Sequence, residues 1–152
     1  MYSSALMAFL HHMAAFTLVG ALVAEVVLFK PPLTIAQARR VQRADQLFGA
    51  AATVLLVVGL LRVFYFEKSA DYYYGNGFFL AKFTLFVLAG LISIYPTLLF
   101  ISWNKALRQG EVPAMAPTAV TRARMCMMWE LTAILGILLC APFMARGIGS
   151  LR

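Results

Sequence analysis

The sequence contains little charge and little cysteine, and both shortages narrow the classes of protein that it can encode. Only 12% of its 152 residues are charged, whereas 62% are hydrophobic and the mean hydropathy is +0.83. These values lie outside the range of soluble globular domains. The two cysteines, Cys126 and Cys140, fall on one predicted helix, about 21 Å apart along its axis. They therefore do not bridge each other, and the composition indicates an integral membrane protein.

Short catalytic motifs are also missing. The sequence has no phosphate-binding glycine loop, no CxxC pair, no HExxH zinc motif and no GxSxG nucleophile elbow. A net charge of +7 is compatible with a nucleic-acid partner, but the basic residues flank apolar segments, as topology signals of membrane proteins do. We therefore expect these basic residues to lie beside the lipid bilayer and not to bind nucleic acid.

Four apolar segments are long enough to cross a bilayer. The first would form about 39 Å of helix against a hydrocarbon core of about 30 Å. It is too long for a signal peptide and lacks a basic n-region, so we expect it to be retained. The predicted fold is all-α, an integral membrane antiparallel four-helix transmembrane bundle in a single domain of residues 1–152. The predicted spans are Ser4–Phe29, Phe48–Phe66, Phe78–Trp103 and Met125–Ala145.

The first connection contains residues that end one helix and residues that begin the next. Pro31 and Pro32 end the first helix, because neither has a backbone N–H to donate. A short amphipathic helix is predicted near Ile35–Arg43, with Thr34 as its cap. The second span then begins at or just after Asp45.

The later connections and helix interiors also carry local signals. The loop Glu67–Gly77 is short enough to make the second and third spans antiparallel neighbours. Pro96, inside the third span, removes a backbone hydrogen bond and predicts a kink. Pro117 suits the first turn of the fourth helix.

The basic residues are unevenly divided between the two ends of the predicted bundle. The first and third connections, with the adjoining helix ends, hold eight of the thirteen: Lys30, Arg39, Arg40, Arg43, Lys105, Arg108, Arg122 and Arg124. The positive-inside rule then places both termini outside. We expect a multi-pass protein of the bacterial inner (cytoplasmic) membrane.

Ionisable residues at membrane depth are costly, and they mark functional sites by default. A b-type haem needs an axial histidine and cations for its two propionates, and a four-helix bundle is a common host. Two alternatives stay open: lysine and arginine can snorkel to the interface, and a lone histidine is usually structural. A sixth iron ligand would have to be a methionine, Cys140, a partner chain or nothing. The candidate cofactor-binding residues near the outer face are His11, His12, Arg62, Lys82 and Arg146.

His11 is the predicted metal ligand of the adjacent histidine pair. His11 and Glu25 are separated by 14 positions, which places them within about 40° of each other on a helix. His12 is turned towards a neighbour or lipid, where its ring can bond to the carbonyl of the preceding turn. If Glu25 faces protein, His11 does so too.

Two acids lie near the inner face of the predicted bundle. Glu25 belongs to the first span and Glu130 to the fourth. We interpret them as candidate catalytic residues, a pair that handles protons. The alternative is that each forms a structural salt bridge with Arg39, Arg43 or Arg122.

Longer strings in all four spans carry a resemblance to a known family. They include His11…Gly20…Glu25, FGAAATVLLVVGLL, FFLAKFTLFVLAGLISIYP and WELTAILGILLCAPF, together with LVGALVAE, LLRVFYFEK, SIYPT and MARG. The chain resembles a small predicted-membrane-protein family related to the HemJ-type protoporphyrinogen oxidases and CopD-like copper-resistance proteins. The resemblance implies a haem-binding helical bundle. It assigns the family's first-helix histidine to His11 (or His12), the third-helix lysine to Lys82 and the fourth-helix acid to Glu130.

These observations predict a haem b-binding membrane protein, an oxidoreductase or electron-transfer component that acts with a quinone or a porphyrin. The alternative is a non-catalytic accessory subunit that joins a larger membrane complex or forms a homo-oligomer. The small residues Gly49–Ala52 motivate this alternative, because they permit close approach of another helix.

Overall fold

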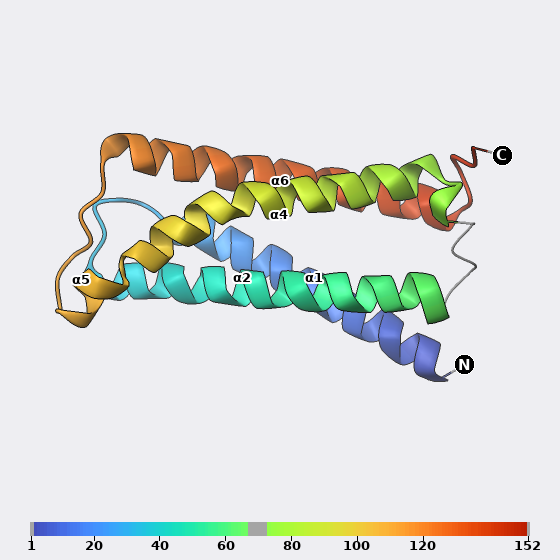
Figure 1. Cartoon of the computed structure of the whole chain (residues 1–152), viewed down its shortest axis with the longest axis horizontal. Helices are drawn as coiled ribbons and strands as arrows, with labels where there is room; N and C mark the ends of the chain where they lie inside the picture. The colour runs from blue at the N-terminus through green and yellow to red at the C-terminus, as the bar shows by residue number, and fades with distance from the viewer. Residues whose placement is uncertain (1, 67–72, 152) are drawn as a thin grey trace.

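Four long helices run antiparallel along one another and form most of the molecule (Figure 1). The structure, a computed structural model, describes residues 2–66 and 73–151. Four helices are long and apolar enough to cross a membrane, which confirms the predicted all-α membrane bundle. In chain order the elements are α1 (Tyr2–Leu28), α2 (Ile35–Leu61) with a π-helical turn η1 (Arg62–Phe66), α4 (Gly77–Ser102), α5 (Asn104–Arg108) and α6 (Pro117–Ala145).

The second helix is longer than the sequence predicted. Thr34 caps it as expected, in a capping box with Gln37. However, the predicted amphipathic segment Ile35–Arg43 and the second span form one continuous helix. The prediction of a separate amphipathic helix was therefore wrong. The reason is that no glycine or proline interrupts the chain here, and one buried stripe continues through Val41 and Phe48.

The start of α4 is tied to the chain after α6. The side-chain oxygen of Asn76 accepts hydrogen bonds from the backbone N–H groups of Phe78 and Phe79, which caps α4. The side-chain amide nitrogen of Asn76 donates to the backbone carbonyl of Ile148 at 3.1 Å. The backbone N–H of Leu151 donates to the backbone carbonyl of Gly75 at 2.8 Å. Residues 67–72, which make up more than half of the predicted loop Glu67–Gly77, lie outside the described residues.

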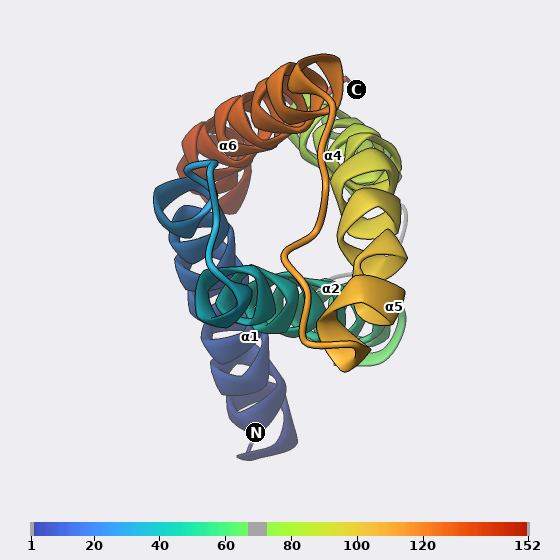
Figure 2. The ribbon, with the colours of Figure 1, turned by 90° about the vertical axis from the view of Figure 1, so that its left-hand side faces the viewer.

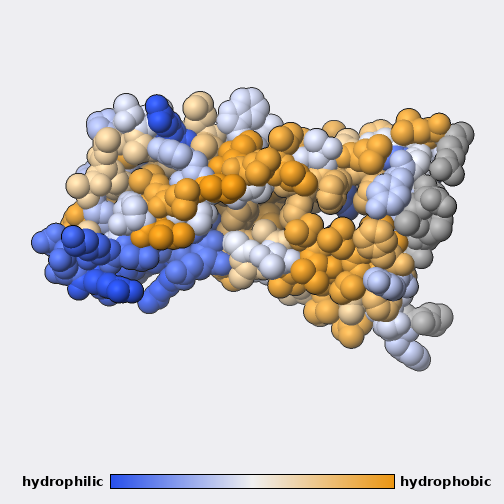
Figure 3. All heavy atoms as spheres, in the orientation of Figure 1, coloured by the Kyte–Doolittle hydropathy of each residue, from blue (hydrophilic) through white to orange (hydrophobic). Residues whose placement is uncertain are grey.

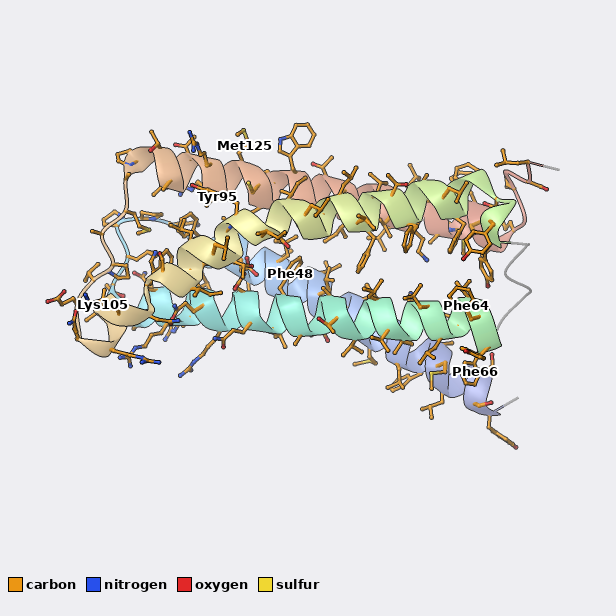
Figure 4. The ribbon with its side chains drawn as sticks, viewed as in Figure 1. Phe48, Phe64, Phe66, Tyr95, Lys105 and Met125 are labelled. Carbon is orange, nitrogen blue, oxygen red and sulfur yellow. The ribbon has the colours of Figure 1, made fainter. Side chains whose placement is uncertain are left out.

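Pro96 and Pro117 both have the positions that the sequence predicted for them. The ribbon of α4 changes direction near the labelled Tyr95, next to Pro96 (Figure 4). Pro117 is the first residue of α6, as predicted. A proline at the first helical position loses nothing, because the N–H groups of the first turn have no intrahelical partner.

The helices pack as two pairs. α1 packs mainly against α2, and α4 mainly against α6, whereas contacts between the pairs are few. Viewed from one end, the order around the bundle is α1, α2, α4 and α6 (Figure 2). The predicted neighbours α2 and α4 are therefore adjacent, but they contact each other much less than each contacts its own pair partner.

Apolar side chains cover most of the outside of the bundle. Phe16, Leu91, Trp129 and Leu135 are each at least 60% exposed. In the space-filling view, hydrophobic residues cover the middle and one end, and strongly hydrophilic residues gather at the end where α5 lies (Figure 3). An apolar exterior of this kind fits contact with lipid tails, since a soluble protein rarely exposes so large an apolar area.

Gly136 of α6 lies against the side chain of Leu85 of α4. A Cβ atom at this position would lie 2.9 Å from Cδ1 of Leu85, so the Leu85 side chain would have to move, and a branched side chain would leave it less room to do so. We expect Gly136→Val to destabilise the bundle by about 1–3 kcal/mol, the usual cost of overpacking. The control is Gly90→Val, because a Cβ at Gly90 meets no atom within 4 Å. Thermal unfolding in detergent, followed by tryptophan fluorescence, would contradict the packing if both variants behaved alike.

Candidate functional site

Three carboxyl groups from three helices lie together inside the bundle. Glu25 of α1 and Glu130 of α6 are each only 1% exposed, and Asp45 of α2 is 7% exposed. Glu25 interacts electrostatically with both Asp45 and Glu130, and Glu130 also interacts with Asp45. We call Glu25, Asp45 and Glu130 the carboxyl cluster. The structure thus brings together the two predicted acids and adds a third.

The fourth helix contributes a hydroxyl to this cluster. Thr97 of α4 donates its side-chain O–H to Oδ1 of Asp45 at 2.6 Å. Because Asp45 lies on α2 and Thr97 on α4, this bond joins the two helix pairs. All four long helices therefore supply one polar side chain to the same layer.

No basic side chain neutralises the carboxyl cluster within the described residues. One oxygen of Glu25 and one of Glu130 are buried without a hydrogen-bond partner. Of the candidate arginine partners, Arg39 donates instead to the carbonyl of Leu107 at 3.1 Å. The predicted alternative, a salt bridge from each acid to a loop arginine, does not occur in this part of the chain.

An aromatic layer lies beside the cluster, towards the α5 end. Phe29 follows Glu25 by one helical turn, and its ring stacks on that of Trp103 with the centroids 6.1 Å apart. The ring of Phe100 contacts both, with centroids 5.5 Å from Phe29 and 4.8 Å from Trp103. All three side chains are almost completely buried. We call these three rings the aromatic layer.

A second polar group lies towards the other end of the bundle. His11 of α1 is half-buried, and its Nδ1 atom is buried without a hydrogen-bond partner. The ring lies against α2, where a Cβ at Gly59 would be 3.4 Å from Cε1 of His11. His11 interacts electrostatically with Lys82 and Arg62, and Lys82 interacts with Arg62 and Cys140. The structure therefore gathers His11, Arg62 and Lys82 as predicted, with Cys140 nearby.

The other two predicted cofactor-binding residues are exposed, although the ring of His12 lies edge-on to that of His11 with the centroids 6.2 Å apart. His12 is exposed, and its Nδ1 atom is 2.6 Å from the carbonyl oxygen of Ala8, one turn earlier on α1. Arg146 is exposed at the C-terminal end of α6 and is not among the groups that interact with His11 or Lys82. The structure places the two histidines on different faces of α1, as predicted. Which of them binds a cofactor, and whether Arg146 does so, stay predictions.

The sequence interpretation missed Asp45 and Thr97. Asp45 was read as the start of the second span, at the membrane surface, because the preceding segment was treated as a separate helix. The missed signal was the spacing on one helix face, since Asp45 lies four residues after Val41 and three before Phe48, both buried. Thr97 gave no comparable signal, because a threonine in an apolar span usually bonds to its own helix.

A bundle of four membrane-spanning helices with ionisable side chains buried at two levels defines a helical integral membrane protein with polar sites in its interior. Residues 3–149 match the model of the family described as Predicted membrane protein (DUF2214). The chain belongs to this family. No curated protein and no solved structure matches the chain. The predicted membership of a predicted-membrane-protein family is confirmed, and the relation to the HemJ-type oxidases and CopD-like proteins stays a prediction.

The Thr97–Asp45 hydrogen bond provides a test of the carboxyl cluster. Thr97→Val keeps the shape of the side chain but leaves Oδ1 of Asp45 without its donor, so we expect a loss of about 1–3 kcal/mol in stability. Thr132→Val is the matched control, because Thr132 is exposed and bonds only within α6, to the carbonyl of Met128. Thermal unfolding of both variants measures the difference. Equal midpoints would show that the bond contributes nothing.

Proposed function

We propose that this protein binds haem b in the membrane and transfers electrons between the haem and a quinone or porphyrin. The observation that carries the proposal is the gathering of one imidazole and two cations from three elements. His11 comes from α1, Arg62 from η1 and Lys82 from α4, and the three interact electrostatically. When bound, haem b supplies one-electron redox chemistry; the residues of this chain bind and orient it.

The residues present fit such a group. An imidazole is the commonest protein ligand of haem iron, and the buried Nδ1 atom of His11 has no partner within the described chain. Arg62 and Lys82 offer positive charge for two carboxylates, with the bidentate geometry of a guanidinium and the point charge of an ammonium. Two basic side chains beside a half-buried histidine would complement a dianionic ligand at this place.

The packing of the helices supports a flat ligand between the two pairs. α2 and α4 make few contacts, although they are adjacent in the bundle. The space-filling view is hollowed along the line between them (Figure 3). Lys82 belongs to α4 and Arg62 to the turn that follows α2, so both flank this line. A planar macrocycle entering from the lipid would meet the cations from two sides.

The accessory-subunit alternative has its own support. A Cβ atom at Gly20, Gly49 or Gly90 would meet no atom within 4 Å, so small residues on the outer faces of α1, α2 and α4 permit close approach of another helix. Under this proposal the chain joins a larger membrane complex or a homo-oligomer. The membership of the family fits both proposals. Native electrophoresis after mild solubilisation separates them, as stable co-migration without haem favours the subunit.

The haem proposal predicts opposite effects of the two histidines. Haem-loaded protein should show a Soret band that His11→Ala abolishes, because the axial ligand is lost. His12→Ala should keep most of the band, since His12 is exposed and bonds within its own turn. Absorption spectra of the purified variants, after haem is supplied, make the measurement. A wild-type protein without a Soret band, or bleaching by His12→Ala alone, contradicts the proposal.

Lys82 provides a quantitative version of the same test. Lys82→Leu should weaken haem binding roughly ten- to a hundredfold, the equivalent of one lost charge-assisted hydrogen bond. The bundle should remain folded, because the change removes a cation that is costly inside a membrane. Lys105→Leu is the control, since Lys105 is exposed at the α5 end. Haem titration gives both affinities, and equal values would remove Lys82 from the site.

The proposed orientation in the bacterial inner membrane is also testable. Eight basic residues lie at the α5 end or on the connections and helix ends beside it, so we propose that this end faces the cytoplasm and both termini face outside. In a background without native cysteines, Tyr74→Cys should react with an impermeant thiol reagent in intact cells. Glu111→Cys should react only after the cells are opened. The reverse pattern would invert the orientation, and labelling of both from one side would contradict the bundle.

A further inference from the structure

The carboxyl cluster contains three acidic side chains and no basic one, and the proposed electron transfer does not explain why. Glu25, Asp45 and Glu130 are buried together, and no basic side chain pairs with them in the described ranges. A buried ionised carboxylate is very costly unless it is paired or hydrogen-bonded. Three such groups therefore require positive charge from outside the side chains of this bundle.

A second, independent observation points to a ligand. One carboxyl oxygen of Glu25 and one of Glu130 are buried and accept no hydrogen bond, although each side chain is 99% enclosed. Buried polar atoms are nearly always paired, so unpaired oxygens facing a shared layer mark a place where something binds. By contrast, Asp45 already has a donor in Thr97.

The arrangement of the oxygens favours a proton over a metal ion. A metal ion draws its carboxylate oxygens to within about 2.0–2.6 Å of one point. Within residues 2–66 and 73–151, no three His, Cys, Asp or Glu side chains converge in a way that would hold a metal ion. A proton needs only one oxygen and turns that oxygen into a donor for its neighbour.

Two polar side chains, Gln42 and Asn104, lie between the cluster and the α5 end. Asn104 is exposed at the start of α5, and its side-chain oxygen accepts a hydrogen bond of 3.1 Å from the amide of Gln42. That amide also donates to the carbonyl of Phe100 at 2.6 Å. Gln42 and Asp45 are three residues apart on α2 and thus share a face. Gln42 therefore lies beside the aromatic layer, on the same face of α2 as Asp45.

The titratable groups that face the cluster come from three of the four long helices. They are Glu25 on α1, Asp45 on α2 and Glu130 on α6, and Cys126 interacts with Glu130 from the preceding turn of α6. α4 contributes the hydroxyl of Thr97, which does not titrate. Towards the α5 end, Arg124 donates to the carbonyl of Phe29 at 3.4 Å, one turn after Glu25.

We propose that the carboxyl cluster is a proton-binding site inside the membrane, loaded from the α5 end through Asn104 and Gln42. A proton from the aqueous phase binds one carboxylate oxygen, the cluster gains one positive charge, and no electron moves. The proposal goes beyond haem binding and does not depend on it, because none of its residues contacts the His11 group.

Infrared spectroscopy of the protein in lipid vesicles tests the site directly. Near neutral pH the wild-type protein should show a carboxylic-acid C=O band that shifts in D2O. Glu25→Gln and Glu130→Gln should each lose part of that band, since glutamine keeps the shape but carries no acid proton. Glu111→Gln should leave it unchanged, because Glu111 is exposed in the loop before α6. The Gln42→Leu variant should keep the band and slow its shift in D2O.

Chemical modification of the wild-type protein gives a second test that does not depend on whether the variants fold. A lipid-soluble carbodiimide, which reacts with protonated buried carboxyl groups, should modify the peptides containing Glu25 or Glu130 in wild-type protein. A water-soluble carbodiimide should modify Glu111 instead. No acid band together with no modification at Glu25 and Glu130 would overturn the proposal. Loss of the band on adding sodium chloride at constant pH would also overturn it, since the site would then bind sodium.

Discussion

The contact of Phe29 with Phe100 and Trp103 holds the two helix pairs together at one end of the molecule. Phe29 follows α1, whereas Phe100 and Trp103 lie at the end of α4, and all three are almost fully enclosed. Lipid tails are as apolar as these side chains, so burial from water does not drive helix pairs together within a bilayer. Shape-matched aromatic packing and hydrogen bonds between the pairs take over that role. The bond from Gln42 to the Phe100 carbonyl reinforces the same junction.

This junction determines where polar groups can be enclosed. Directly beside it, the pairs come close enough for Thr97 of α4 to reach Asp45 of α2. Further along, α2 and α4 make few contacts, and the His11 group lies in that part of the bundle. One end is therefore closely packed around the carboxyl cluster, whereas α2 and α4 contact each other less beside the His11 group. The two proposals follow from this difference in packing along one axis.

Much of the fold could be predicted from the sequence, because the bilayer restricts spanning segments to long apolar helices. The spans, the cap at Thr34 and the start at Pro117 all agree with the structure. The continuity of α2 was missed, because charged residues before Asp45 resemble a surface segment even when a helix carries them past the interface. A single helix also does not reveal which pairs pack tightly, since that depends on close approaches such as Gly136 to Leu85.

The site was predictable where a single helix decides the geometry. The different faces of His11 and His12 follow from rotation along α1, and the structure confirms them. The meeting of Glu25 and Glu130 was also predictable, because both residues lie at a similar distance along their helices from the same face of the membrane. Asp45 and Thr97 could not be placed, because their meeting requires the docking of one pair on the other. The exposure of Arg146 depends likewise on how α6 ends.

The pairing of consecutive helices has a consequence for the way the chain enters the membrane. α1 with α2, and α4 with α6, are each neighbours in the chain apart from the short α5. The first hairpin can therefore insert and close before the second has been synthesised. Until the second arrives, Glu25 and Asp45 lack the helices that enclose them, so the early hairpin carries two acids towards lipid. Docking of the second hairpin would then remove them from lipid, so this order of packing is compatible with the association of two separately inserted halves.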